Sequence, residues 1–280
     1  MLMQKTKINI LSFDIEDYFQ VDNFRKTISF SQWSNFEVRV EKNTKRILNI
    51  LEEYDTRATF FVLGWIAEKF PNLIKEIHQL GHEIASHGFD HQLVTSKDAR
   101  TFREDIRKSK RLLEDIIQEP VYGYRAPTFS ITKDSEWAFD ILMEEGFKYD
   151  SSVFPFRYDK TGLPENKRYI HKIYNQQHYL WELPISNVKI LGKNFPFSGG
   201  GYFRLFPYDF IKNIIQKHNN TNHIVIVYLH PWELDPKQPK IKAGFLNSFR
   251  HYVNIAKTEN KLKNLLDDFE FGPIRENIEL

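Results

Sequence analysis

The stretch Ser86-His87-Gly88-Phe89-Asp90-His91 decides how the rest of the chain is interpreted. It follows a short strand-like segment, residues 83–86, and it carries two histidines four positions apart. About seventy positions earlier, the apolar run 8–13 ends in Asp14-Ile15-Glu16-Asp17. Imidazole and carboxylate groups together are typical ligands of a divalent metal. The sequence therefore predicts a metal site shared by two strand ends.

Working outward from these two segments, strand and helix patterns alternate four times by residue 150, which predicts a parallel α/β architecture. The predicted strands are 8–13, 58–63, 83–86, 121–125, 147–150 and 224–229. The predicted helices are 43–54, 71–80, 97–117, 134–146, 208–218 and, in two pieces, 247–268. Residues 20–39 are irregular and aromatic and indicate a loop or lid, whereas 169–174 and 179–185 predict an added hairpin.

Charged residues stand at the ends of several predicted strands. Asp14, His87, Arg125 and Asp150 each occupy such a position, and His230 follows the most apolar strand. Reactive groups collect at the carboxyl ends of strands in parallel α/β folds. These residues are therefore expected to share one site.

Composition limits the classes of function. The 280 residues carry a net charge of +2, with the basic residues spread along the chain, which argues against a nucleic-acid partner. There is no cysteine, which excludes disulfides and thiolate ligands, and the aromatic content of 15% suits the binding of sugar rings. The apolar run 8–13 is too short for a signal segment and no run approaches a membrane span, so we expect a soluble, cytoplasmic protein without a transmembrane segment.

Structural explanations compete for several of these residues. Taken alone, His87 and His91 are more often a buried histidine and a loop cap than ligands, and the acids after residue 13 shift the balance. His82 points to the opposite face of its segment and is expected to be structural. Asp150 could equally be a turn residue, and His230 could be a strand-end histidine bonded to backbone. The run Gly199-Gly200-Gly201 lacks the phosphate-loop pattern and indicates a close turn.

Five motifs in order resemble the NodB-homology polysaccharide deacetylases, carbohydrate esterase family 4. They are Ser12-Phe13-Asp14, Ser86-His87 to His91, Arg125-Ala126-Pro127, Asp150-Ser151-Ser152-Val153-Phe154-Pro155 and Leu229-His230-Pro231. The amino-acid sequences of residues 13–19, 200–204 and 230–236 most resemble the branch found in exopolysaccharide gene clusters, including the exosortase-associated group. The resemblance implies a distorted, incomplete (β/α) barrel, here with an added β-hairpin and a C-terminal helical extension. It also implies a single domain over 1–280, with a motif core at 8–231 and an extension at 232–280.

The resemblance also implies residue roles. Asp14 matches the general base, held by Arg125, and His230 matches the general acid, tuned by Asp150. His87 and His91 match two metal ligands, with zinc the expected ion. The backbone at Thr128 matches an oxyanion donor, and Pro127, Tyr202 and Trp232 are further expected substrate contacts.

The third metal ligand departs from the common pattern, because Ile15 stands where many members have a second aspartate. Strand alternation puts positions 14 and 16 on one face and favours Glu16, whereas a sharp turn after Asp14 would bring in Asp17. The expected activity is metal-dependent removal of N-acetyl groups from amino sugars of a polysaccharide or its lipid-linked precursor. The alternatives are an amidohydrolase acting on a small or cyclic amide, as in allantoinases, and a catalytically silent glycan-binding module.

Overall fold

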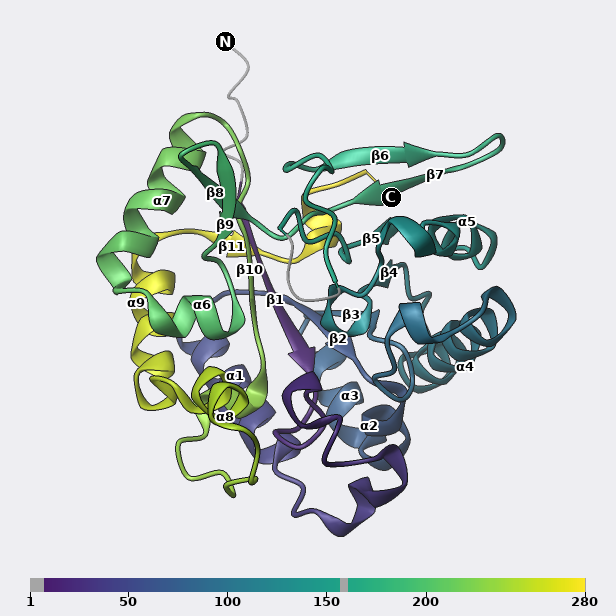
Figure 1. Ribbon diagram of the computed structural model, residues 1–280, viewed down its shortest axis with the longest axis horizontal. Coiled ribbons are helices and arrows are strands. Elements are labelled where there is room, and N and C mark those ends of the chain that lie inside the picture. The colour runs from purple at the N-terminus through teal and green to yellow at the C-terminus, as the bar shows by residue number, and fades with distance from the viewer. Residues whose placement is uncertain (1–7, 157–160, 280) are drawn as a thin grey trace.

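The computed structural model describes residues 8–156 and 161–279, and its central feature is one curled, mostly parallel sheet (Figure 1). The strand order is β10-β1-β2-β3-β4-β5-β7-β6, and β11 pairs separately with β1. All neighbours are parallel except the edge pair β6 and β7, which form an antiparallel hairpin. The predicted incomplete barrel with an added hairpin is therefore confirmed.

The strands are short and their central members are fully buried. Their bounds are β1 Asn9–Ile15, β2 Thr59–Val62, β3 Glu83–Ser86, β4 Gly123–Tyr124, β5 Tyr149–Asp150, β6 His171–Tyr174, β7 Tyr179–Glu182, β10 Ile226–Leu229 and β11 Phe271–Gly272. A separate hairpin, β8 Asn187–Ile190 with β9 Lys193–Pro196, was not predicted. Parallel strands covered by helices are buried on both faces, which explains the apolar sequences of β2 and β10. Strand β1 is equally buried but also carries Asn9, Ser12 and Asp14.

Helices surround the outside of the sheet (Figure 1). They are α1 Val40–Glu53, α2 Gly64–Lys69, α3 Pro71–Gln79, α4 Ala99–Ile117, α5 Trp137–Glu144, α6 Gly200–Leu205, α7 Tyr208–Asn220, α8 Phe245–Tyr252 and α9 Thr258–Asp268. The two-piece helix predicted near the C-terminus is confirmed as α8 and α9. Each helix in the described ranges is too short or too polar to cross a lipid bilayer.

The predicted lid is a packed segment. Residues 20–39 contain two 3-10 helices, η1 Asp22–Phe24 and η2 Phe30–Asn35. Phe24 and Trp33 are buried in the core, and Trp33 packs edge-on against Trp65 of α2. The aromatic residues that suggested a loop thus close one side of the barrel.

The start of α1 differs from the prediction because its capping group comes from another part of the chain. The helix was expected to begin at Asn43, yet it begins at Val40 with Arg39 as the N-cap. The Asp17 carboxylate accepts the N–H groups of Arg39 (2.6 Å) and Val40 (2.8 Å). A carboxylate at these donors satisfies groups that the helix leaves unpaired and complements its dipole.

The predicted Gly-rich turn is the beginning of a short helix. Gly199 is the N-cap of α6, and a Cβ atom there would lie 2.1 Å from the Tyr228 ring. The helix can approach β10 this closely only with glycine at the contact.

Candidate active site

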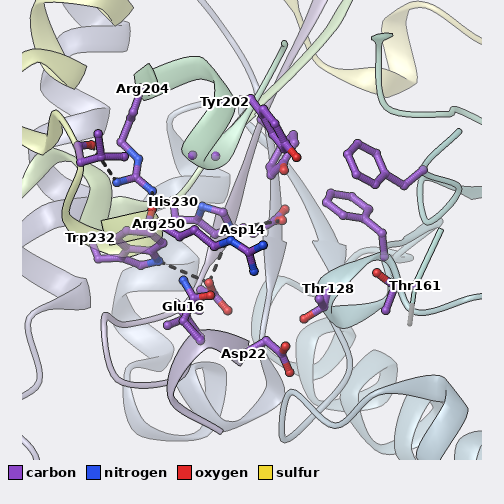
Figure 2. Close-up of a pocket in the computed structure, with 18 of the residues that line it drawn as sticks. Asp14, Glu16, Asp22, Thr128, Thr161, Tyr202, Arg204, His230, Trp232 and Arg250 are labelled. Carbon is purple, nitrogen blue, oxygen red and sulfur yellow. Dashed lines mark hydrogen bonds and ion pairs between the residues drawn. The ribbon is translucent and has the colours of Figure 1, made fainter. Parts of the chain in front are cut away.

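The ends of β1 and β10 bring the acid and the histidine predicted from the sequence side by side. Phe13 of β1 is paired in register with Leu229 of β10, so the next residues, Asp14 and His230, leave neighbouring strands together. His230 Nε2 lies 3.8 Å from Asp14 Oδ2 and 3.5 Å from Glu16 Oε1. All three residues line one cavity of about 340 Å³ (Figure 2).

Arg125 holds Asp14 in a buried ion pair. Its Nη1 donates to Asp14 Oδ1 (2.6 Å) and to Ser12 Oγ (3.0 Å). Its Nε and Nη2 donate to the carbonyl and hydroxyl oxygens of Ser151 (3.2 and 3.0 Å), and the guanidinium lies over the Phe61 ring. Because every edge of the guanidinium is engaged, Asp14 is fixed in one orientation.

Glu16, His87 and His91 form a group able to bind a metal ion. One potential ligand atom from each lies within 4.8 Å of the others, and all three residues are buried. Glu16 Oε2 is 2.7 Å from His91 Nε2 but takes no hydrogen bond from any described residue. A buried oxygen without a hydrogen-bond donor, facing two imidazoles, is the arrangement that a divalent cation satisfies.

Local structure sets the two histidines. His87 follows β3, and its Nδ1 is 2.8 Å from the Arg125 carbonyl oxygen, so Nδ1 carries the proton and Nε2 is left as a ligand. His91 lies in the loop that follows His87 and has a left-handed backbone (φ 55°). The first N–H groups of α2, at Gly64 and Trp65, donate to the carbonyls of this loop. This short helix, which was not predicted from the sequence, therefore fixes the loop.

Two of the three residues in the metal-binding group, Glu16 and His87, have pKa values that suit ligation. Burial raises the pKa of Glu16, but the neighbouring His91 and His230 have the larger combined effect and lower it to about 2. Glu16 is therefore a carboxylate. Burial lowers the pKa of His87 to about 4, which keeps that imidazole neutral. Metal ligands must be deprotonated, so Glu16 and His87 are in the required form. Burial lowers the pKa of His91 but Glu16 raises it overall, so a bound ion would have to displace a proton from that imidazole.

Asp17 has a different role. Besides capping α1, its carboxylate accepts the Tyr18 N–H (2.9 Å), so both oxygens are used by backbone. Burial raises its pKa to about 6, against these hydrogen bonds. Of the two acids left open by the sequence, the structure places Glu16 with the histidines and Asp17 in the α1 cap.

The carboxylate partner of His230 is Glu233, which sequence reasoning missed. His230 Nδ1 lies 2.6 Å from Glu233 Oε1, and the same oxygen accepts the His230 backbone N–H (3.0 Å). Arg204 of α6 donates from Nε to the other Glu233 oxygen (2.6 Å). Burial lowers the pKa of His230, but Glu16, Glu233 and Asp14 raise it to about 9. The spacing of three between His230 and Glu233, which matches a capping box, was the available sequence signal.

Asp150 is correspondingly not the partner expected for His230. It accepts the Ser152 N–H (2.9 Å) and hydroxyl (2.6 Å), and it lies opposite Glu182 across the parallel pair β5 and β7. Burial raises the pKa of both carboxyls, and for Glu182 the neighbouring Asp150 adds to the rise. The strand that carries Asp150 thus supports Arg125 through Ser151, and Asp150 makes no recorded contact with the histidine.

Three of the four predicted substrate-contact residues line the cavity, and the fourth, Pro127, does not. Thr128, with a left-handed backbone (φ 56°), and Tyr202 line the cavity (Figure 2). Trp232 also borders it but is 4% exposed, stacks on His251 and donates its indole N–H to Glu16 (3.3 Å). Pro127 is buried in the turn before Thr128 and is not among the described residues that line the cavity. His82 accepts the Ala58 N–H and has the structural role expected.

Two family models match the chain. Residues 25–142 match the polysaccharide deacetylase model, and residues 151–279 match a domain of unknown function, DUF3473. The first segment supplies His87, His91 and Arg125, and the second supplies His230 and Glu233. The cavity therefore draws on both matched segments.

Curated relatives match part of the chain. A peptidoglycan deacetylase of Helicobacter pylori is 30% identical over 40% of this chain and 38% of its own length. A peptidoglycan-N-acetylglucosamine deacetylase of Bacillus cereus is 33% identical over 34% of this chain and 35% of its own length. The chain thus spans little more than a third of these relatives.

Solved structures share the fold over nearly the whole chain. A structure described as a candidate polysaccharide deacetylase of Mycobacterium smegmatis has a TM-score of 0.63 at 19% identity, covering 97% of this chain and 88% of that one. The Puue allantoinase has a TM-score of 0.62 at 15% identity, covering 96% and 88%. At these identities the likeness concerns fold alone. Residues 25–142 thus match the polysaccharide deacetylase model, the curated relatives matched over part of the chain are deacetylases, and the solved structures add a likeness of fold.

Proposed function

We propose that this protein is a metal-dependent N-deacetylase that hydrolyses N-acetyl groups on amino sugars of a polysaccharide or its lipid-linked precursor and releases acetate. The observation that carries the proposal is the convergence of three groups in one cavity. These are the Glu16–His87–His91 cluster, the Asp14–Arg125 pair and the His230–Glu233 pair. Amide hydrolysis needs an activated water, stabilisation of an oxyanion and a proton for the leaving nitrogen.

Glu16, His87 and His91 would hold the ion. Two imidazoles and one carboxylate are a ligand set that suits zinc and leaves a position open for substrate. When bound, the ion would polarise the amide carbonyl and lower the pKa of a water. The Trp232 indole N–H and the Arg125 carbonyl orient two of the ligands from outside the group.

Asp14 is the proposed general base. One of its oxygens is held by Arg125, and the other faces the cavity side where His230 lies 3.8 Å away. The fixed oxygen leaves the second one free to accept a proton from an attacking water. Holding the carboxylate in place reduces the cost of reaching the reactive geometry.

His230 is the proposed general acid. Its Nδ1 is held by Glu233, and its Nε2 points to the acids of the cavity. The raised pKa keeps the imidazole protonated near neutral pH. Nε2 can then donate its proton to the departing amine nitrogen while Glu233 stabilises the positive charge.

The substrate would lie between the metal-binding group and the outer wall of the cavity. Thr128 at the cavity wall is proposed to present a backbone N–H to the oxyanion, and Tyr202 to contact the sugar. Residues beyond 231 complete this wall, since α8 contributes Leu246 and Phe249. That shared wall supports the proposal that 1–280 is one domain, with the extension 232–280 belonging to the site. We also propose that the protein belongs to the exopolysaccharide-cluster branch, because of the sequences of residues 13–19, 200–204 and 230–236.

Acetate release tests the function directly. Purified protein would be stripped of metal, reloaded with Zn²⁺ and assayed on N-acetylated chito-oligosaccharides and on peptidoglycan, with allantoin as the contrasting small cyclic amide. We expect acetate only from the sugars and only with metal. The variants His87→Ala and His82→Ala form a matched pair, of which only the first should abolish Zn²⁺ binding in equilibrium dialysis. Turnover of allantoin without acetate release, or full activity of metal-free protein, would overturn the proposal.

A further inference from the structure

Helix α8 presents large apolar side chains to solvent beside the cavity. Phe245 is 88% exposed, Leu246 56% and Phe249 48%. Leu246 and Phe249 also line the cavity, so the apolar surface continues into its wall. Contiguous exposed apolar groups mark binding surfaces more often than single ones do. Figure 1 shows α8 next to the loop that precedes it, at the edge of the molecule.

The sequence around α8 is basic. Residues 236–258 contain no Asp or Glu, and they carry Lys237, Lys240, Lys242, Arg250 and Lys257. The first three lysines are exposed and make no ion pair with any described residue. This is a local excess in a chain whose net charge is only +2.

Two described acids next to this segment already have basic partners elsewhere. The 3-10 helix η1 packs on α8, where the Asn247 side-chain amide donates to the Asn23 carbonyl. Its one acid, Asp22, is paired with Arg25 (3.2 Å). The acid just before the segment, Asp235, is paired with Arg39 (2.6 Å). Within the described ranges, the exposed Lys237, Lys240 and Lys242 therefore give this side of the protein a positive charge.

The helix is fixed to the body of the protein. Arg204 donates from Nη2 to the Arg250 carbonyl (3.0 Å) and from Nη1 to the carbonyls of His251 and Val253. These are carbonyls at the end of α8, which would otherwise lack partners. Figure 2 shows Arg204 and Arg250 beside the cavity. The exposed side chains are thus carried on a rigid support.

We propose that α8 and the loop 236–244 dock on an anionic lipid surface, with the apolar side chains entering the interface and the lysines meeting lipid phosphates. Amphipathic helices with aromatic and basic residues bind membranes in this way. A protein partner fits the surface less well, because lysine is depleted in protein–protein interfaces. A second copy of this chain would bring like charges together.

Docking would place the mouth of the cavity at the head-group layer. If the proposed deacetylase function holds, the substrate of this chain is then an amino sugar attached to a lipid carrier. This consequence rests on the proposed function, whereas the docking itself does not.

Co-sedimentation with vesicles tests the docking. The full chain would be mixed with vesicles of phosphatidylcholine alone or mixed with phosphatidylglycerol, at low and high salt. We expect binding only to the anionic vesicles, weakened by salt. Removing three positive charges with K237Q/K240Q/K242Q should weaken binding on the order of 100-fold. The substitution Phe245→Ser should weaken it about tenfold or more.

The hairpin β8–β9, which lies apart from α8 in Figure 1, provides a matched control. Leu191→Ser removes a 98% exposed apolar side chain, and K189Q/K193Q removes two exposed lysines from the same hairpin. Both controls should bind anionic vesicles like the unmodified chain. Equal losses in the hairpin and α8 variants, or no binding by the unmodified chain, would overturn the proposal.

Two further measurements distinguish membrane docking from dimer formation and from the proposed deacetylase function. Sedimentation velocity would show whether the chain forms a dimer. If Phe245→Ser converts a dimer to monomer but leaves vesicle binding unchanged, α8 is an interface between two copies of this chain and the membrane proposal is wrong. Acetate release from soluble chito-oligosaccharides should be unchanged in Phe245→Ser. A chain that binds vesicles yet never releases acetate would refute the proposed function and leave the docking standing.

Discussion

Glu233 is the carboxylate on which the proposed acid role of His230 depends, so Glu233→Gln is the sharpest perturbation of the site. Glu233 is fully buried between His230 and Arg204. Glutamine has nearly the same shape but only one acceptor oxygen. If that oxygen faces His230, the new NH₂ group meets Arg204. If it faces Arg204, the NH₂ group meets His230 Nδ1 and opposes its protonated form.

The size of the effect follows from the bond that is weakened. A hydrogen bond to a charged group contributes about 1.5–3 kcal/mol. At about 1.36 kcal/mol for each factor of ten, kcat/KM should fall roughly 10- to 150-fold. Loss of the negative charge also lowers the pKa of His230, which Glu233 helps to raise to about 9. The acid then loses its proton at lower pH, so the alkaline limb of the pH–rate profile moves to lower pH.

The assay is acetate release from chito-oligosaccharide between neutral and alkaline pH, with bound Zn²⁺ measured in the same samples. Asp150→Asn is the matched control, because Asp150 was the partner expected from the sequence and contacts Ser152 instead. It should leave the alkaline limb in place even if it lowers stability. The reasoning is refuted if Asp150→Asn shifts the limb and Glu233→Gln does not.

Three further predictions follow from buried carboxylates and from Arg125. Glu16→Gln should weaken Zn²⁺ binding by more than the roughly 10- to 100-fold seen when a residue that only supports a ligand is lost. Asp17→Ala should lower the free energy of unfolding by about 1–3 kcal/mol and leave metal affinity unchanged. Isothermal titration and urea unfolding would give the opposite pattern if Asp17 were the ligand. Glu182 has a pKa raised well above 4.5 by burial, so the folded state holds a proton that the unfolded state releases, and stability falls by up to about 1.4 kcal/mol per pH unit above 4.5. Glu182→Gln should reduce that slope in urea titrations without abolishing it, because Asp150 and Asp17 also have raised pKa values, and the exposed Glu68→Gln should leave it unchanged. Arg125→Lys cannot hold Asp14 and Ser151 at once, so about 1–3 kcal/mol of stability and most acetate release should be lost, and an unchanged melting curve would contradict the geometry.

Short-range patterns predicted most of the architecture. The apolar runs at 8–13 and 224–229 correspond to β1 and β10, because strands buried on both faces need apolar side chains almost throughout. The amphipathic pattern at 97–117 corresponds to α4, since one face must pack on the sheet. The errors are local: the start of α1, the short helices α2 and α6, and the β8–β9 hairpin. Each depends on a contact with a distant segment or is too short for periodicity to reveal.

For the site, strand ends and alternation predicted the participants more reliably than their pairings. Asp14, His87, Arg125 and His230 all line or border one centre, and alternation along β1 favoured Glu16. Alternation is a property of the backbone itself, so it can be read from consecutive residues. The partner of His230 could not be predicted in this way, because two carboxylates, Asp150 and Glu233, were available in the sequence.

The sequence by itself determined the strand–helix order, the chemical types at the strand ends and the absence of thiolate ligands, because these depend on residue identity and local periodicity. The tertiary structure decided which groups meet. The register of β1 against β10 sets Asp14 beside His230, and the α1 donors take Asp17 away from the metal-binding group. Packing of α6 and α8 puts Arg204 behind Glu233 and leaves Phe245 in solvent. The physical reason is that hydrogen bonds and burial depend on distances between segments, which no local pattern encodes.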